Sequence, residues 1–388
     1  MYCGSAEPGN SADAVSRIDR LLTALLFQAV GIFMVGFFIL APLSAQDVPD
    51  SSARVSAERQ YQNGVKLAQL GNSTSAEAHL RAAWAIEPTE PRYVQSLTIY
   101  YIHCHEFTKA LEVLRDYVKR SGPTPLGWTL QGELLFEQRH YNLAYQSLRS
   151  ALDMSNDNYR AHELLGLIYS VFGKYSLGLG ELKIAAQQNP TSPQVHYYLG
   201  RLYYQTYEYL SARDEFLECL KLKPNYPEAR ENLGLAYEAL GDSASALAQY
   251  RQALSMEKTG LVPRSEYPYV CLGLLLEKEG QTTKAITLIK EGLERNPDSS
   301  WANFELGRLL FKVNHGSSGE HYLKRAETLD KNFSRVHYFL GRIYRETNRP
   351  RQAQTEFALF QELDKNPENR QPRSSSRALN SEPPDLVR

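Results

Sequence analysis

The sequence has few cysteines and almost no net charge, and both shortages exclude classes of protein. Its four cysteines, Cys3, Cys104, Cys219 and Cys271, are scattered over 388 residues, which excludes a disulfide scaffold and a CxxC metal site. Lys and Arg number 43 against 44 Asp and Glu, so the net charge is −1. Proteins that bind nucleic-acid backbones carry an excess of positive charge. We therefore expect no nucleic-acid partner.

The sequence also lacks the motifs of common catalytic sites. It contains no Gly-rich phosphate loop and no GxSxG or HExxH motif. The stretch His103-Cys104-His105 resembles a metal cluster, but alternate residues on a helix point apart. We expect no catalytic residue, no metal and no cofactor, and we predict that the chain is not an enzyme.

One long uncharged run, residues 21–45, lies near the N-terminus. It exceeds the ~20 residues that a helix needs to span a bilayer. Basic residues precede it and acidic residues follow it, so the positive-inside bias predicts that residues 1–20 are cytoplasmic. Two interpretations remain open, a signal peptide cleaved near Ala45 and a retained transmembrane anchor. The first predicts a periplasmic or secreted protein, and the second a membrane-anchored protein with the rest of the chain outside the cytoplasm.

Much of the remaining chain repeats every 34 residues. Leu-Gly-Arg begins at Leu199, Leu306 and Leu340, and the last two copies are 34 residues apart. A fixed period of this length is typical of solenoid proteins. The period is broken once, by an insertion at 261–265. The predicted blocks are 57–90, 91–124, 125–158, 159–192, 193–226, 227–260, 266–299, 300–333 and 334–367.

The columns of these nine blocks predict a pair of helices joined by a turn. Position 8 is glycine in every block except the second, where it is Thr98, and position 20 is always Ala or Gly. Position 24 is always large and apolar, for example Leu148 or Phe216. Small residues at fixed places let two helices approach closely. Position 15 is Gly or Asn in six blocks, and these residues tolerate the left-handed conformation that ends a helix.

These columns resemble the tetratricopeptide repeat, whose pattern is W-x₂-L-G-x₂-Y…A-x₃-F…P. Trp128 occupies the Trp position in the third block. The fifth block matches the later positions with Leu199, Gly200, Tyr203, Ala212, Phe216 and Pro224. The resemblance covers 57–367 and implies an all-α fold, a right-handed superhelical solenoid. Residues 46–56 are predicted to be a linker and residues 368–388 a disordered tail.

The resemblance also implies that the first helices of the blocks line a groove that binds partners, at positions 2, 5, 9, 12 and 13. The candidate binding residues are Tyr197, Arg201, Tyr204, Trp301, Phe304, Arg308, Phe311, Arg335, Tyr338, Arg342 and Arg345. Their basic and aromatic side chains predict a partner with an extended acidic or C-terminal segment. The alternative is that Arg201 and Arg308 pair with neighbouring glutamates, while Tyr197 and Tyr338 pack between blocks.

Together these observations predict a non-enzymatic scaffold for protein–protein interaction that is exported across a membrane or anchored in it. The predicted partners are a protein or peptide and, through the N-terminal segment, a membrane. Two alternatives remain open, a self-associating structural assembly factor and a regulatory subunit of an envelope or secretion complex. His196 and His337 share block position 4, so we interpret them as features of the repeat rather than as a catalytic pair.

Overall fold

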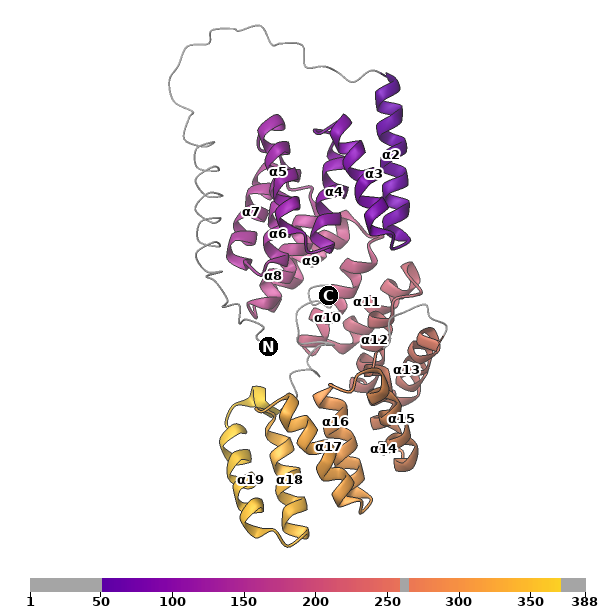
Figure 1. Ribbon diagram of the computed structural model, residues 1–388, viewed down its shortest axis with the longest axis vertical. Coiled ribbons are helices and arrows are strands. Elements are labelled where there is room, and N and C mark those ends of the chain that lie inside the picture. Colours follow the sequence, from indigo (N-terminus) through magenta and orange to yellow (C-terminus); the bar gives the residue numbers. More distant parts are fainter. Residues whose placement is uncertain (1–50, 259–264, 371–388) are drawn as a thin grey trace, which may run out of the picture. The chain divides into compact units, whose positions relative to one another are not determined.

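The computed structural model describes residues 51–258 and 265–370. Within these ranges the chain forms eighteen α-helices, one short 3₁₀ helix and no strand (Figure 1). The helices are α2 (Ser51–Gln69), α3 (Ser73–Ile86), α4 (Pro91–His103), α5 (Phe107–Ser121), α6 (Pro125–Glu137), α7 (Tyr141–Met154), α8 (Tyr159–Val171), α9 (Tyr175–Gln188), α10 (Pro193–Gln205), α11 (Tyr209–Leu222), α12 (Pro227–Ala239), α13 (Ser243–Lys258), α14 (Tyr267–Lys278), α15 (Thr282–Arg295), α16 (Ser300–Lys312), α17 (Gly316–Leu329), α18 (Ser334–Glu346), α19 (Pro350–Leu363) and η1 (Pro367–Arg370). The predicted all-α solenoid is confirmed.

The described helices pack against their neighbours in the chain. Helices such as α6 and α7, or α16 and α17, form closely packed pairs (Figure 1). First helices of several consecutive pairs also touch one another. Helix α6 contacts α8, α8 contacts α10, and α16 contacts α18. This second set of contacts places α4, α6, α8, α10 and α12 in one row and α16 beside α18, which is how neighbouring repeats of a solenoid share one core.

The packing within each pair depends on a glycine facing a large side chain. A β-carbon at Gly200 would lie 2.6 Å from the ring of Phe216, and one at Gly132 would lie 2.6 Å from Leu148. These residues occupy positions 8 and 24 of their blocks. The structure therefore confirms that the small residue at position 8 allows the two helices to approach closely.

The two helices of each pair are joined by a turn with one residue at positive φ. The nine such residues of the described chain are Gly71, His105, Arg139, Gly173, Tyr207, Gly241, Gly280, Asn314 and Asn348. All occupy block position 15, but His105, Arg139 and Tyr207 carry β-carbons that disfavour this conformation. A hydrogen bond closes each turn over six residues, as Glu208 N donates to Tyr203 O at 2.8 Å. This capping interaction enforces the turn where the residue type does not.

Two predicted boundaries differ from the helices of the structure. Helix α2 begins at Ser51, inside the segment 46–56 that was predicted to be a linker, because no Gly or Pro occurs in residues 51–56. Arg54 on this extension pairs with Glu87 at 3.0 Å. The 3₁₀ helix η1 reaches Arg370 and so enters the predicted tail 368–388. The rest of that tail and most of the insertion 261–265 lie outside the described residues.

The localisation predicted from the N-terminal run needs correction. None of the helices between α2 and α19 that the structure describes is both long and apolar enough to cross a bilayer. Residues 1–20 and 21–45, with the expected cleavage point at Ala45, lie outside the described residues. We therefore withdraw the prediction of a protein exported across a membrane or anchored in it.

Candidate partner-binding surface

Helix α18 carries four of the predicted binding residues along one face. They are Arg335, Tyr338, Arg342 and Arg345. Tyr338 is 38% exposed, Arg345 is exposed, and the two other arginines are half-buried. Arg342 has one carboxylate partner, Glu346, at 3.8 Å. Neither Arg335 nor Arg345 forms an ion pair within residues 51–258 and 265–370. The positive charge of this face is therefore mostly unbalanced.

Aromatic rings hold the arginines of the α18 face in place. The guanidinium carbon of Arg335 lies 5.2 Å from the ring centre of Phe304, and that of Arg342 lies 4.9 Å from Phe311. Such contacts attract the cation electrostatically but leave the N–H groups at its edge able to donate hydrogen bonds. The arrangement can therefore present guanidinium groups to carboxylates.

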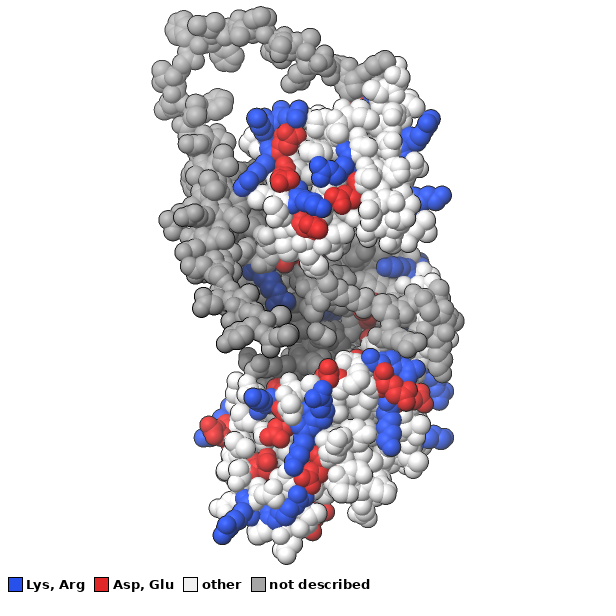
Figure 2. All heavy atoms as spheres, in the orientation of Figure 1, with Lys and Arg blue, Asp and Glu red and all other residues white. Residues whose placement is uncertain are grey.

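The basic character of α18 is local. On the face of the described chain drawn in Figure 2, blue Lys and Arg atoms are interspersed with red Asp and Glu atoms. A protein that binds nucleic acid through its phosphates presents instead a broad basic patch or stripe. The arginines of α18 therefore form a small cluster on a surface of mixed charge.

The arginine of the preceding first helix, Arg308 on α16, is neutralised within the protein. Its Nε donates to Glu305 at 2.7 Å and its Nη1 donates to Glu277 at 3.0 Å. Lys312 donates to the same Glu277 carboxylate at 2.8 Å. The hydrogen bond from Arg308 lowers the pKa of Glu277 to about 2. The structure therefore shows Arg308 paired with neighbouring glutamates, which was the alternative interpretation of the sequence.

Several predicted binding residues lie inside the packing between helices. Phe304 is fully buried and meets Phe333 edge-on at 4.6 Å between ring centres. Tyr197 is 1% exposed, stacks on Tyr226 at 5.0 Å and accepts a hydrogen bond from Asn232. Phe311 and Arg201 are also buried, at 9% and 5% exposure. These side chains therefore pack beneath the surface and have little exposed area for contact with a partner.

Two predicted residues are intermediate in exposure. Trp301 packs against Tyr267, with 5.2 Å between the ring centres. Tyr204 meets Tyr209 edge-on at 5.1 Å, and burial raises the pKa of its hydroxyl to about 12. Both rings therefore lie partly exposed on first helices, α10 and α16.

The prediction missed an ionic network on α6 and α8. Arg160 donates to Glu163 at 2.9 Å and also pairs with Glu133, and both glutamates are buried. Burial disfavours the charge of Arg160, yet the two carboxylates raise its pKa well above the usual value. These residues occupy groove positions 2, 5 and 9 of blocks three and four. Opposite charges at those positions were the signal that could have revealed the network.

Histidines at block position 4 pair with a glutamate nineteen residues later. His162 Nδ1 lies 2.6 Å from Glu181, and His196 Nδ1 lies 2.7 Å from Glu215. Glu215 raises the pKa of His196 through this hydrogen bond. His337 makes the same kind of pair, so it and His196 are features of the repeat, as their shared position predicted.

Comparisons with known proteins support the repeat. The tetratricopeptide repeat family model matches residues 129–193, 165–227 and 197–263, so the presence of these repeats is confirmed. A search of curated proteins found no match.

Solved structures share the fold. The crystal structure of the APC/C hetero-tetramer Cut9-Hcn1 has a TM-score of 0.60 and 15% identity, and it covers 70% of this chain and 52% of its own. A monomeric IFIT1 mutant with m7Gppp-AAAA has a TM-score of 0.52 and 14% identity, over 80% of this chain and 78% of its own. A tetratricopeptide repeat protein from Parabacteroides merdae has a TM-score of 0.44 and 18% identity, over 74% and 98%.

The first two likenesses, with TM-scores above 0.5, support the fold only. The matched part spans about half of the Cut9-Hcn1 chain, and every identity is too low to carry over a partner or an activity. Tetratricopeptide repeats generally form scaffolds that bind other proteins and are not themselves enzymes. The fold therefore supports a role in protein–protein interaction.

Proposed function

We propose that this protein is a scaffold that binds an extended acidic segment of a partner protein along helix α18. The observation that carries the proposal is the unbalanced charge of the α18 face, where Arg335 and Arg345 have no carboxylate partner among the described residues. A partner carboxylate would form charge-assisted hydrogen bonds with a guanidinium group already held over a ring. Binding would therefore cost little side-chain entropy.

The spacing of the arginines fits an extended peptide. Arg335 and Arg342 are seven residues apart on one helix, which corresponds to about 10 Å along its axis. A peptide in the extended polyproline II conformation covers this distance in about three residues and places the side chains of residues i and i+3 on the same side. Two acidic residues separated by two others could therefore reach both arginines, and the exposed ring of Tyr338 lies between them to cover an apolar side chain.

We also propose that the α18 face ends an array of nine repeats with the boundaries predicted from the sequence, 57–90 to 334–367. Eighteen helices in residues 51–258 and 265–370 support this count. The first-helix row that the pairs form would then supply further contacts to a longer partner.

Peptide binding tests the proposal directly. A fluorescein-labelled decapeptide with Glu-Leu-Ala-Glu at its centre is titrated with the full chain, and a peptide with Lys in place of Glu is the control. Versions of the acidic peptide with a free and an amidated C-terminus distinguish side-chain carboxylates from a terminal one. We expect saturable binding of the acidic peptide that weakens as salt is added.

The matched variants are Arg342→Glu with Arg345→Glu, and, as control, Arg251→Glu with Arg351→Glu. Arg251 and Arg351 are exposed on second helices, so the control changes the net charge by the same amount. We expect the first pair to weaken binding more than tenfold and the control less than twofold. Equal losses in the two pairs, or no binding of the acidic peptide, would contradict the proposal.

A second candidate function is self-association as an assembly factor. Helices α9 and α11 expose Leu177 and Leu210 at 53% and 58%, and Leu217 at 42%. Exposed apolar side chains of this size favour contact with another protein surface. Light scattering of the full chain over a hundredfold concentration range tests this candidate, and a constant monomer mass would exclude it.

A further inference from the structure

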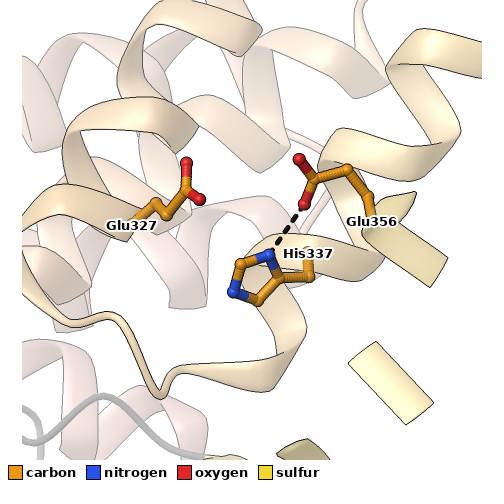
Figure 3. Close-up of side chains that lie close together, drawn as sticks. All are labelled: Glu327, His337 and Glu356. Atoms are coloured by element: carbon orange, nitrogen blue, oxygen red, sulfur yellow. Dashed lines mark hydrogen bonds and ion pairs between the residues drawn. The ribbon is translucent and has the colours of Figure 1, made fainter. Parts of the chain in front are cut away.

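Three side chains that can bind a metal meet near the end of the described chain. Glu327 on α17, His337 on α18 and Glu356 on α19 each place a ligand atom within 4.8 Å of the other two (Figure 3). Both carboxylates point toward the edge of the imidazole that carries Nδ1, and this nitrogen lies 2.7 Å from Glu356 Oε2. The histidine side chain is 4% exposed, so its ring is fixed by packing.

The third carboxylate distinguishes this cluster from the other histidine pairs. His162 and His196 pair with Glu181 and Glu215 in the same way. At the block position that Glu327 occupies in the eighth repeat, position 28, the repeats before those two histidines have Leu152 and Ala186. Only the pair at His337 is therefore joined by a second acidic residue from the preceding helix pair.

In the equivalent pairs the other ring nitrogen faces a backbone carbonyl. His162 Nε2 lies 3.2 Å from the carbonyl oxygen of Asn156. His196 shows the same contact, with Nε2 3.0 Å from the carbonyl of Pro190. A carbonyl oxygen only accepts hydrogen bonds, so Nε2 of such a histidine donates. Histidines that bind metals are commonly oriented in this way. In His337, Nδ1 shares a proton with the Glu356 carboxylate, and a metal ion bound to Nδ1 would displace that proton.

We infer that Glu327, His337 and Glu356 form a binding site for one divalent transition-metal ion of the Zn²⁺ type. One imidazole nitrogen and two carboxylate oxygens are three ligands that Zn²⁺ accepts, and water would take the fourth position. Ligands at about 2.1 Å in a tetrahedron are about 3.4 Å apart. The two partly buried glutamates would reach that geometry by small changes of their side-chain torsions. The ion would replace the proton shared by His337 and Glu356.

Such an ion would connect α17, α18 and α19. It would fix the last helix pair to the one before it, at the end of the array where no later repeat packs among the described residues. It would also hold the helix that carries the arginine face. The inference depends only on the three ligands, so it stands or fails independently of peptide binding by α18.

The test uses the full chain after treatment with a chelator, and Zn²⁺ alone as the probe. Native mass spectrometry gives the number of bound ions, competition with a chromophoric chelator gives the affinity, and thermal unfolding gives the change in Tm. We expect one tightly bound ion and a Tm that rises by several degrees with Zn²⁺, because the ion binds the folded state.

Two variants locate the ion. Glu327→Gln keeps the size of a half-exposed side chain, and we expect it to weaken Zn²⁺ binding at least tenfold while leaving the Tm in chelator unchanged. Glu181→Gln breaks the corresponding pair at His162, so it should lower the Tm in chelator but retain the response to Zn²⁺. No rise of Tm in the parent protein, or an equal rise in the Glu327→Gln protein, would overturn the inference.

Discussion

Helices α16 and α18 carry arginine at the same repeat position, but only one of the two arginines is neutralised. Arg308 on α16 is bound by Glu277 and Glu305. At the two corresponding places around Arg342 the chain has Phe311 and Phe339. Arg342 therefore lies over a ring, and within the described residues its only carboxylate partner is Glu346 of its own helix, at 3.8 Å.

This difference shows that the residue type at a groove position does not determine whether its side chain is available to a partner. Two neighbouring positions, one on the preceding first helix and one on the same helix, determine whether the arginine is part of a buried ion pair or can bind a partner. Substitutions in the two helices test this distinction.

Removing each arginine should have opposite consequences in the two helices. Arg308→Met leaves the buried Glu305 without its cation and leaves Glu277 with Lys312 alone, and breaking such a pair costs about 3 kcal/mol of unfolding free energy. Arg342→Met removes a partly exposed cation and should change stability by less than about 0.5 kcal/mol. Urea unfolding of both variants measures the difference. Similar losses would show that the two arginines are equivalent.

The ion pair between Glu277 on α14 and Arg308 on α16 should also make stability sensitive to acid. The pKa of Glu277 is about 2 in the folded protein and near 4.5 in the unfolded chain. The unfolded state therefore binds the proton first, and the contribution of the pair is complete above pH 4.5 and is lost as the pH falls toward 2. We expect Glu277→Gln to remove about 2 kcal/mol of this acid dependence. Unfolding of the parent protein and of the Glu277→Gln protein is measured at pH 7 and pH 3. Equal losses of unfolding free energy on acidification in the two proteins would contradict the lowered pKa of Glu277.

The packing of the two helices should respond equally, because it does not involve their arginines. A β-carbon at Gly307 would lie 2.7 Å from Leu323, and one at Gly341 would lie 2.8 Å from Phe357. Overpacking at either site should cost about 1–2 kcal/mol in Gly307→Ala and Gly341→Ala. Gly316→Ala is the control, since nothing lies within 4 Å of its β-carbon. A loss at only one of the two sites would mean that the pairs pack differently.

The repeat pattern predicted this packing because it depends on local and periodic features. Glycine at position 8 and a large residue at position 24 are visible in the sequence, and so are Gly and Asn at most of the turns. The left-handed turns at Arg139 and Tyr207 could not be predicted from residue type, since a hydrogen bond across the turn overrides the preference of the side chain.

The binding surface was harder to predict for a different reason. Groove positions face both outward and toward the next first helix, so a residue such as Phe304 is buried by its neighbour on α18. The pairing of Arg308 with Glu277 spans 31 residues and becomes apparent only when adjacent blocks are compared position by position.

A glutamate introduced beside Arg342 should pair with it, as Glu305 pairs with Arg308 on α16. Phe339 is half-buried and lies three residues before Arg342, as Glu305 lies before Arg308. We expect Phe339→Glu to engage Arg342 and to weaken binding of the acidic peptide about tenfold, which corresponds to about 1.4 kcal/mol. Phe339→Gln removes the same ring without adding charge and serves as the control. If both variants lose affinity equally, the ring itself and not the free charge of Arg342 is responsible.

The smallest effects should come from the turns that end the first helices. Asn314 after α16 and Asn348 after α18 have φ of 64° and 56°, and glycine at either site should stabilise the fold by a few tenths of a kcal/mol at most, because Asn tolerates this conformation. Tyr207 has φ of 65° and is 77% exposed, so Tyr207→Gly removes backbone strain with little loss of packing and should add about 1 kcal/mol. Denaturant midpoints of the three variants rank these sites. If Tyr207→Gly destabilises the protein, then contacts of its ring outweigh the strain, and the turns differ in more than their backbone.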